Sequence, residues 1–275
     1  MRVGIGLPNV IPGADRDLLV EWARRAEAGP FASLGSLHRA AWPVLDPLEA
    51  LATVAPETGR VDLVTMVAVA PLYETERLAK EAATVDDASG GRLVLGVSVG
   101  ARREDFEAAG VDPRGRGERL DRQLVSLRDT WESEGRRVPP ILVGGTADLA
   151  FARMARWSDG YVHGGGPPRA LAGAVLKARA AWAEFGRPGG PRIWGQSYFA
   201  LGDEETIERA RAYTREYYAF TGPFVERIVE DLLTTPQQVA ARVRGYAEAG
   251  CEDLVMIPTV ADPGQVDLLG EVLAS

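Results

Sequence analysis

The side chains best suited to proton chemistry are the two histidines, His38 and His163, and each closes a short apolar run. Imidazole is the side chain that most readily takes up or releases a proton near neutral pH. His38 ends the run "SLGSLH", and Trp42 follows four residues later. His38 is therefore a candidate acid or base beside an aromatic wall formed by Trp42. The alternative is a polar residue that closes a strand.

The segment "ILVGGT" leads from an apolar strand directly into a helical pattern. Glycines let a ligand approach the backbone closely, and the unpaired N–H groups of a helix start favour anions. Gly144, Gly145 and Thr146 are thus a candidate cradle for a phosphate. The alternative is an ordinary turn in which Thr146 serves as the helix N-cap.

The segment "YVHGGGPP" repeats this arrangement and makes His163, Gly164 and Gly165 a second candidate anion contact. A loop that needs glycines for its turn explains the same residues equally well. Arg102 and Arg103 could hold a phosphate or carboxylate, or could form a solvated helix start with the acidic residues that follow. The aromatic cluster in "REYYAFTGPF" (215–224) fits a core, a substrate pocket wall or a subunit interface.

Composition excludes several classes of protein. The 275-residue chain carries a formal net charge of −8, whereas a nucleic-acid binder is basic. Its two lysines, Lys80 and Lys177, lie in helical patterns, which argues against Schiff-base chemistry. Two histidines and one cysteine are too few for a structural zinc cluster, and no metal site is predicted.

The single cysteine, Cys251, cannot form an intramolecular disulfide and is predicted to be a small buried residue. Together with the lack of a charged and apolar leader, this favours the cytoplasm. No apolar run is long enough to cross a bilayer, so no membrane partner is expected.

Strand-like and helical patterns alternate along the whole chain. The expected strands are "RVGIGLP", "SLGSLH", "VDLVTMVAV", "RLVLGVSV", "PILVGG", "DGYVHG", "RIWGQSYFAL" and "EDLVMIP". The expected helices cover about 15–28, 47–55, 74–88, 117–134, a segment from 146, 168–185, 204–233 and 236–249.

Eight strands with intervening helices predict a single-domain α/β protein, a (β/α)8 TIM barrel over residues 1–275. A doubly wound open sheet is the alternative, but the first strand is not followed by a dinucleotide-binding glycine motif. Active sites of such barrels lie at the carboxyl ends of the strands. Both histidines, Met66, Val67 and Ser98 fall at predicted strand ends, and Ser98 is a further candidate contact for a bound cofactor.

Several of these segments resemble the luciferase-like monooxygenase superfamily. The likeness is carried by "VGIGLP", "RLAKEAATVDDASGGRLVLGVSVG" (77–100), "RGERLDRQLVSLRDTW" (116–131), "PPILVGG" (139–145), "SDGYV" (158–162) and "TPQQVAARVRGYAEAGCEDLVM" (235–256). The resemblance covers most of the chain. It implies a barrel that binds flavin mononucleotide (FMN) or the deazaflavin coenzyme F420.

The resemblance also implies roles for individual residues. The bond Met66–Val67 corresponds to a non-proline cis peptide in a bulge that backs the cofactor ring, and Gly144 to Thr146 correspond to the phosphate region. His38 and Trp42 match a spacing in members that oxidise a sugar phosphate. There the histidine takes the substrate proton while the ring accepts hydride, and the tryptophan forms a ring wall.

The sequence differs from the family pattern at three places that bear on these implied roles. Ala101 occupies the position of an expected acidic residue, Val99 that of a phosphate-binding arginine, and the segment between Trp131 and Pro139 is short.

The resulting expectation is an oxidoreductase that transfers hydride between its cofactor and a small-molecule substrate. Segments such as "AWAEFGRPGGP" are similar to actinobacterial members, where the deazaflavin is common, so coenzyme F420 is preferred over FMN. The alternatives are an FMN-dependent monooxygenase, or a barrel that has lost its cofactor and serves in binding or assembly. A homodimer is left open.

Overall fold

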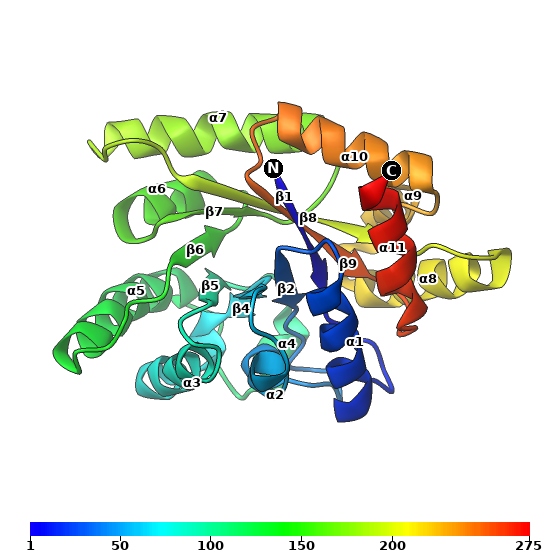
Figure 1. The fold of residues 1–275 in the computed structure, drawn as a ribbon. Coiled ribbons are helices and arrows are strands. Elements are labelled where there is room, and N and C mark those ends of the chain that lie inside the picture. Colours follow the sequence, from blue (N-terminus) through cyan, green and yellow to red (C-terminus); the bar gives the residue numbers. More distant parts are fainter.

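The computed structural model describes residues 1–275, and nine parallel strands lie at its centre (Figure 1). They are β1 (Arg2–Gly6), β2 (Ser33–Ser36), β3 (Asp62–Thr65), β4 (Ala68–Val69), β5 (Leu93–Ser98), β6 (Ile141–Gly144), β7 (Gly160–His163), β8 (Arg192–Phe199) and β9 (Asp253–Pro258).

The strands close into a barrel. Strand β1 pairs with both β2 and β9, and β5 pairs with both β3 and β4. Strands β3 and β4 occupy one barrel position, where the sequence predicted a continuous strand over 61–69. A cis peptide between Met66 and Val67 separates them. The barrel therefore has eight strand positions, and the predicted (β/α)8 fold is confirmed.

Helices surround the barrel. Figure 1 shows α7 and α10 on one side, with α2, α3 and α5 on the other. The helices are α1 (Arg16–Ala28), α2 (Pro47–Val54), α3 (Thr75–Ala88), α4 (Arg103–Ala108), α5 (Arg116–Ser133), α6 (Asp148–Trp157), α7 (Pro168–Glu184), α8 (Glu204–Tyr217), α9 (Val225–Glu230), α10 (Pro236–Glu248) and α11 (Gly264–Ala274). Short 3₁₀ turns cover Ala55–Glu57, Ala70–Leu72 and Ala219–Phe224.

The predicted helix over 204–233 is wrong as a single element. It is divided into α8, a 3₁₀ turn and α9, because Gly222 takes a positive φ of 59° and Pro223 follows it. The apolar spacing of the sequence continues across this break, although no residue between Tyr217 and Val229 is buried. The C-terminal helix α11 was missed, whereas α4 corresponds to the helix start that the sequence offered as one alternative for Arg102 and Arg103.

Side chains alternate between two cores, because successive residues of a strand point to opposite faces. The larger cluster lies between the barrel and its helices and includes Trp22 and Trp131. The smaller cluster fills the barrel and includes Val64, Val94, Leu142, Val162, Trp194 and Val255. It continues to Tyr217 and Leu232. The segment after β8 thus caps part of the barrel mouth.

Several helices begin at side-chain caps. Asp15, Asp46 and Asp203 accept hydrogen bonds from backbone N–H groups of α1, α2 and α8. Thr235 and Gln238 form a capping box on α10. These caps satisfy N–H groups that a helix start otherwise leaves free. None of the helices is long and apolar enough to cross a membrane.

Candidate functional site

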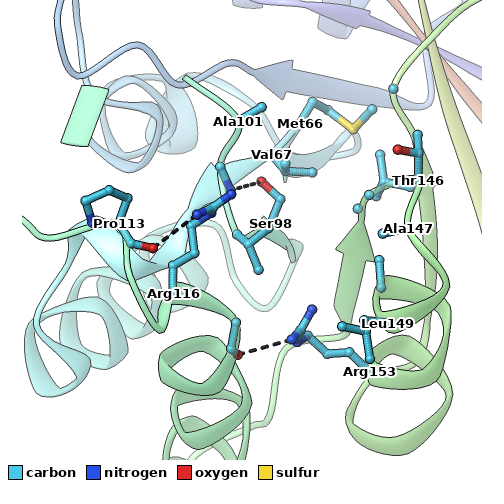
Figure 2. Close-up of a pocket in the computed structure, with 18 of the residues that line it drawn as sticks. Met66, Val67, Ser98, Ala101, Pro113, Arg116, Thr146, Ala147, Leu149 and Arg153 are labelled. Carbon is cyan, nitrogen blue, oxygen red and sulfur yellow. Dashed lines mark hydrogen bonds between the residues drawn. The ribbon is translucent and has the colours of Figure 1, made fainter. Parts of the chain in front are cut away.

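A cavity of about 560 Å³ opens at the carboxyl ends of β4 to β8, within the size range of small-molecule sites. Seven residues predicted to bind a cofactor line it: Met66, Val67, Ser98, Gly144, Gly145, Thr146 and Gly164. The strand ends therefore bring together segments that are separated by up to about a hundred residues in the sequence. Figure 2 shows the Met66–Val67 bulge and Thr146 on one part of the wall.

The Met66–Val67 peptide is cis, as the resemblance implied. The neighbouring strand approaches the bulge closely at Gly96, where a Cβ atom would lie 2.1 Å from the Thr65 carbonyl oxygen. The Thr65 hydroxyl also donates to the Gly96 carbonyl at 2.6 Å. Glycine is thus required at position 96 for the bulge to sit against β5.

The turn after β6 leads to a helix start without a side-chain cap. Helix α6 begins at Asp148, its N-cap is Ala147, and no side chain accepts from its first N–H groups. The interpretation of Thr146 as an N-cap is therefore wrong, and the expected helix start at 146 lies two residues too early. Gly145 has a φ of +140°, which disfavours other residues. The Ala150 N–H donates to the Ala147 carbonyl at 2.8 Å, and the N–H groups of Asp148 and Leu149 are the ones left to face an anion.

Three arginines line the same cavity: Arg114, Arg116 and Arg153. Arg153 forms a salt bridge with Asp121 at 2.6 Å, and Arg114 forms one with Asp112 at 2.7 Å. Arg116 has no carboxylate partner, and its Nη1 donates to the Pro113 carbonyl at 3.1 Å. Arg116 and Arg153 project from α5 and α6 (Figure 2).

The wall contains no aspartate or glutamate, although the whole chain is acidic. Helix α5 also starts without a side-chain cap, at Gly115 with a φ of +68°. Two helix starts without side-chain caps and one arginine without a carboxylate partner, Arg116, therefore line one cavity, and this arrangement favours a phosphate.

The sequence analysis did not predict that Arg116 and the start of α5 line the cavity, because "GRGER" is typical of a polar loop before a helix. The signal was an arginine between two glycines at a helix start that has no capping residue. Ala101 lines the cavity without supplying an acid, as the departure from the family pattern implied.

His38 is buried and is not part of this cavity wall. Its Nδ1 accepts from the Val69 N–H at 3.1 Å, so the ring proton of the neutral form is on Nε2. That Nε2 lies 3.9 Å from the Asp46 carboxylate, to which the Tyr73 hydroxyl also donates. Burial lowers the pKa of His38, and the negative charge of Asp46 only partly opposes this effect. The imidazole is thus neutral at neutral pH.

Trp42 lies beside an aromatic and cationic cluster above the barrel. Its ring meets the edge of Tyr217 at 5.6 Å, and the Arg39 guanidinium stacks on it at 4.5 Å. Arg102 stacks on the Tyr217 ring, also at 4.5 Å. The ring surfaces of Trp42 are thereby covered in part by other side chains of this chain.

Neither predicted anion-binding arginine of the "GARRED" segment reaches the cavity. Arg103 is 86% exposed and pairs with Glu107 at 2.8 Å, so the solvated helix start is the observed arrangement. The side chain of Arg102 is 14% exposed and lies within the aromatic cluster, where Tyr217 and Phe220 contact its guanidinium.

His163 points away from the cavity that its neighbour Gly164 lines. Its ring packs between Tyr161 and Tyr246, at centroid distances of 6.3 and 6.4 Å, in the layer between the barrel and α10. Burial lowers its pKa. The alternation of side chains along β7 explains this, because Val162 takes the interior position and His163 the opposite one. Gly165 lines a second cavity beyond Gly164.

The family model described as luciferase-like monooxygenase matches residues 1–231 of the chain. Among curated proteins, an uncharacterized protein of Mycobacterium tuberculosis (strain ATCC 25618 / H37Rv) is 30% identical over 164 residues, which are 53% of this chain and 57% of that protein. The oxygenase component of the flavin-dependent trigonelline monooxygenase of Acinetobacter baylyi is 29% identical over 123 residues, 43% of this chain and 34% of that protein. The match thus spans little more than half the length of the mycobacterial relative and about a third of the Acinetobacter one.

Among solved structures, an F420-dependent secondary alcohol dehydrogenase in complex with an F420-acetone adduct superposes with a TM-score of 0.84. The superposition covers 99% of this chain and 98% of that one at 15% identity, which establishes likeness of fold. The monooxygenase RslO1 of Streptomyces bottropensis has a TM-score of 0.75 at 17% identity, and covers 100% and 99% of the two chains. Because the family model matches most of the chain, and the fold is the expected barrel, the chain belongs to the luciferase-like monooxygenase family.

Proposed function

We propose that this protein is a flavin-type oxidoreductase that holds a phosphorylated cofactor, coenzyme F420 in preference to FMN. It would transfer hydride between that cofactor and a small organic substrate. The observation that carries the proposal is the 560 Å³ cavity, whose wall combines three arginines, two uncapped helix starts and no carboxylate. FMN and F420 both carry a phosphate, and both present a flat ring that suits the apolar bulge.

The proposed contacts follow from the wall. Arg116, Gly144 to Thr146 and the first N–H groups of α6 would hold the phosphate, and Met66 and Val67 would back the ring. The cofactor supplies the capacity to accept or donate hydride. The protein side chains bind it, orient it and exclude water.

The preference for F420 rests on two findings about other proteins. The structure with a TM-score of 0.84 is F420-dependent by its name, and relatives at 30% identity occur in mycobacteria. The flavin-dependent trigonelline monooxygenase supports the second candidate, an FMN-dependent monooxygenase. A cofactor-free binding or assembly protein is the third.

His38 stays the predicted acid or base, with Trp42 as the predicted wall. The Nδ1 of His38 is occupied by the Val69 N–H, so the proton-carrying Nε2 is the atom that would exchange protons. In that role His38 would act together with Asp46 and Tyr73, which lie on its Nε2 side.

Titration with F420 and with FMN, followed by the fluorescence of each cofactor, tests the proposal. We expect saturable binding of F420 and weaker binding of FMN. Tighter binding of FMN would favour the monooxygenase. The absence of binding by either cofactor would refute the oxidoreductase function and favour the third candidate.

A further inference from the structure

A second cavity, of about 870 Å³, opens at the same end of the barrel. It lies between the loop after β7 and the segment of α9, at the carboxyl end of β8. It shares Gly164 with the first cavity. Gln196 of the first cavity donates both to the Gly164 carbonyl at 3.1 Å and to the Tyr198 hydroxyl of the second at 3.3 Å. The two cavities thus meet at one narrow boundary.

Aromatic and aliphatic side chains form much of this second wall. Tyr198 and Tyr218 lie at the inner end, and Ile228 and Phe224 lie farther along the chain. Phe224 is 54% exposed and leaves apolar ring surface of this wall in contact with solvent. A flat apolar molecule would remove this surface from water.

The charges of this wall do not cancel. Arg169 and Arg227 are exposed and make no ion pair. Asp231 is neutralised by Arg242, whose Nη2 lies 2.7 Å from its carboxylate. Glu230 is the only remaining free carboxylate of the lining. Two free cations against one free anion favour a ligand with a negative charge.

The inner end of the cavity offers a hydroxyl proton. The hydroxyls of Tyr218 and Tyr198 lie 2.5 Å apart, and Gln196 already donates to the Tyr198 oxygen. Whichever tyrosine donates to the other, one hydroxyl proton of the pair is left without an acceptor. Burial raises the pKa of both phenols, so both remain protonated and can donate.

We propose that this second cavity is the substrate compartment, and that it takes a planar ring compound bearing one acidic group, such as an aryl carboxylate. The ring would pack on Phe224 and Ile228, the acidic group would face Arg169 and Arg227, and the tyrosine pair would donate to an oxygen at the inner end. This inference rests on the proposed function, because the boundary at Gly164 places such a ligand next to the cofactor cavity. His38 lines neither cavity, so for this ligand the tyrosine pair, and not His38, is the group that faces the substrate oxygen.

Calorimetric titration with 2-naphthoate and with the neutral 2-naphthalenemethanol tests the inference directly. We expect 2-naphthoate to bind the more tightly. Arg227→Gln should weaken 2-naphthoate about fivefold and leave the alcohol unchanged, since an exposed charge pair contributes up to ~1 kcal/mol. Phe224→Ala should weaken both compounds.

Matched controls lie outside the cavity. Arg244→Gln removes an exposed arginine of α10 that makes no ion pair, and Phe185→Ala removes another exposed phenylalanine. Neither should change the binding of either compound. The inference is overturned if 2-naphthoate does not bind, if it binds no more tightly than the alcohol, or if the control variants lose as much affinity as the cavity variants.

The cofactor titration separates the two proposals. With cofactor bound, 2-naphthoate should change the cofactor fluorescence, and Arg227→Gln should shift the midpoint of that change by the same fivefold. If the cofactor binds but 2-naphthoate leaves its fluorescence unchanged, the substrate compartment is refuted and the proposed function stands. If 2-naphthoate binds and neither cofactor does, the proposed function fails and so does the role as a substrate compartment, while the anion site itself is supported.

Discussion

Arg116 is the residue whose replacement tests the phosphate site most sharply. It lies at the first position of α5, lines the 560 Å³ cavity and has no carboxylate partner, whereas Arg114 and Arg153 are each paired. In Arg116→Gln the positive charge is removed while a side chain of similar length is kept. Since Arg116 is exposed, the substitution should change the free energy of unfolding by no more than about 0.5 kcal/mol.

The expected loss of binding follows from the strength of one charge-assisted hydrogen bond. Such a bond contributes about 1.5–3 kcal/mol, and each 1.4 kcal/mol corresponds to a tenfold change in Kd. Solvent screening at this exposed position places the effect near the lower value. Arg116→Gln should therefore weaken F420 and FMN about tenfold, and raising the salt concentration should diminish the difference from the wild type.

Fluorescence titration measures this, and riboflavin provides the decisive comparison because it has the ring of FMN without the phosphate. Riboflavin should bind equally to the wild type and to Arg116→Gln. Arg122→Gln, which removes an exposed and unpaired arginine from the same helix outside the cavity, is the matched control. Unchanged FMN affinity in Arg116→Gln, or an equal loss for riboflavin, would refute the assignment of the phosphate to this end of the cavity.

Three further predictions concern stability and reactivity. Gly96→Ala should lower the free energy of unfolding, measured by urea titration, by about 1–3 kcal/mol, because the new Cβ would clash with a backbone carbonyl. The control Gly173→Ala lies at an open position of α7 and should be neutral or stabilising. Equal effects of the two substitutions would contradict the close approach of the backbone at Gly96. Cys251 should not react with iodoacetamide at pH 8 in the native protein but should react after unfolding, since burial raises the pKa of its thiol to about 12. Rapid reaction of Cys251 in the native protein would disprove its burial. Burial lowers the pKa of His38 and of His163 in the native protein. In the unfolded chain both histidines have their ordinary pKa of about 6.5, so below that pH the unfolded chain binds more protons than the native protein. The free energy of unfolding should therefore be highest above pH 7 and should fall below pH 6.5 by up to about 1.4 kcal/mol per pH unit for each histidine. Urea unfolding at a series of pH values measures this profile, and His38→Gln should remove the contribution of one histidine from it.

The strand and helix patterns of the sequence were sufficient to predict the barrel. Runs such as "RLVLGVSV" and "EDLVMIP" are buried on both faces, which is typical of parallel strands, and their regular alternation with amphipathic helices leaves few other architectures. The break at Met66–Val67 came from the resemblance to a family, because local propensity over 61–69 favours a continuous strand. The break at Gly222 was missed because the apolar spacing continues across it.

The sequence also determined which segments line the 560 Å³ cavity. Gly144 to Thr146, Ser98 and Gly164 follow apolar strands, and parallel strands of a barrel bring their carboxyl ends to one rim. What the sequence left open was the direction of each side chain at that rim. His163 and Gly164 are adjacent, yet only Gly164 faces the cavity, because neighbouring residues of a strand point to opposite sides.

Only the tertiary structure decided which charges are free. The sequence contains many arginines close to acidic residues, and local spacing does not reveal that Arg153 is neutralised by Asp121, 32 positions away, while Arg116 has no such partner. Likewise, the segment 217–231 carries its aromatic residues into both the barrel mouth and the second cavity. The ion pairs of the arginines and the walls of the two cavities depend on contacts between distant parts of the chain. Those contacts exist only once the barrel has closed.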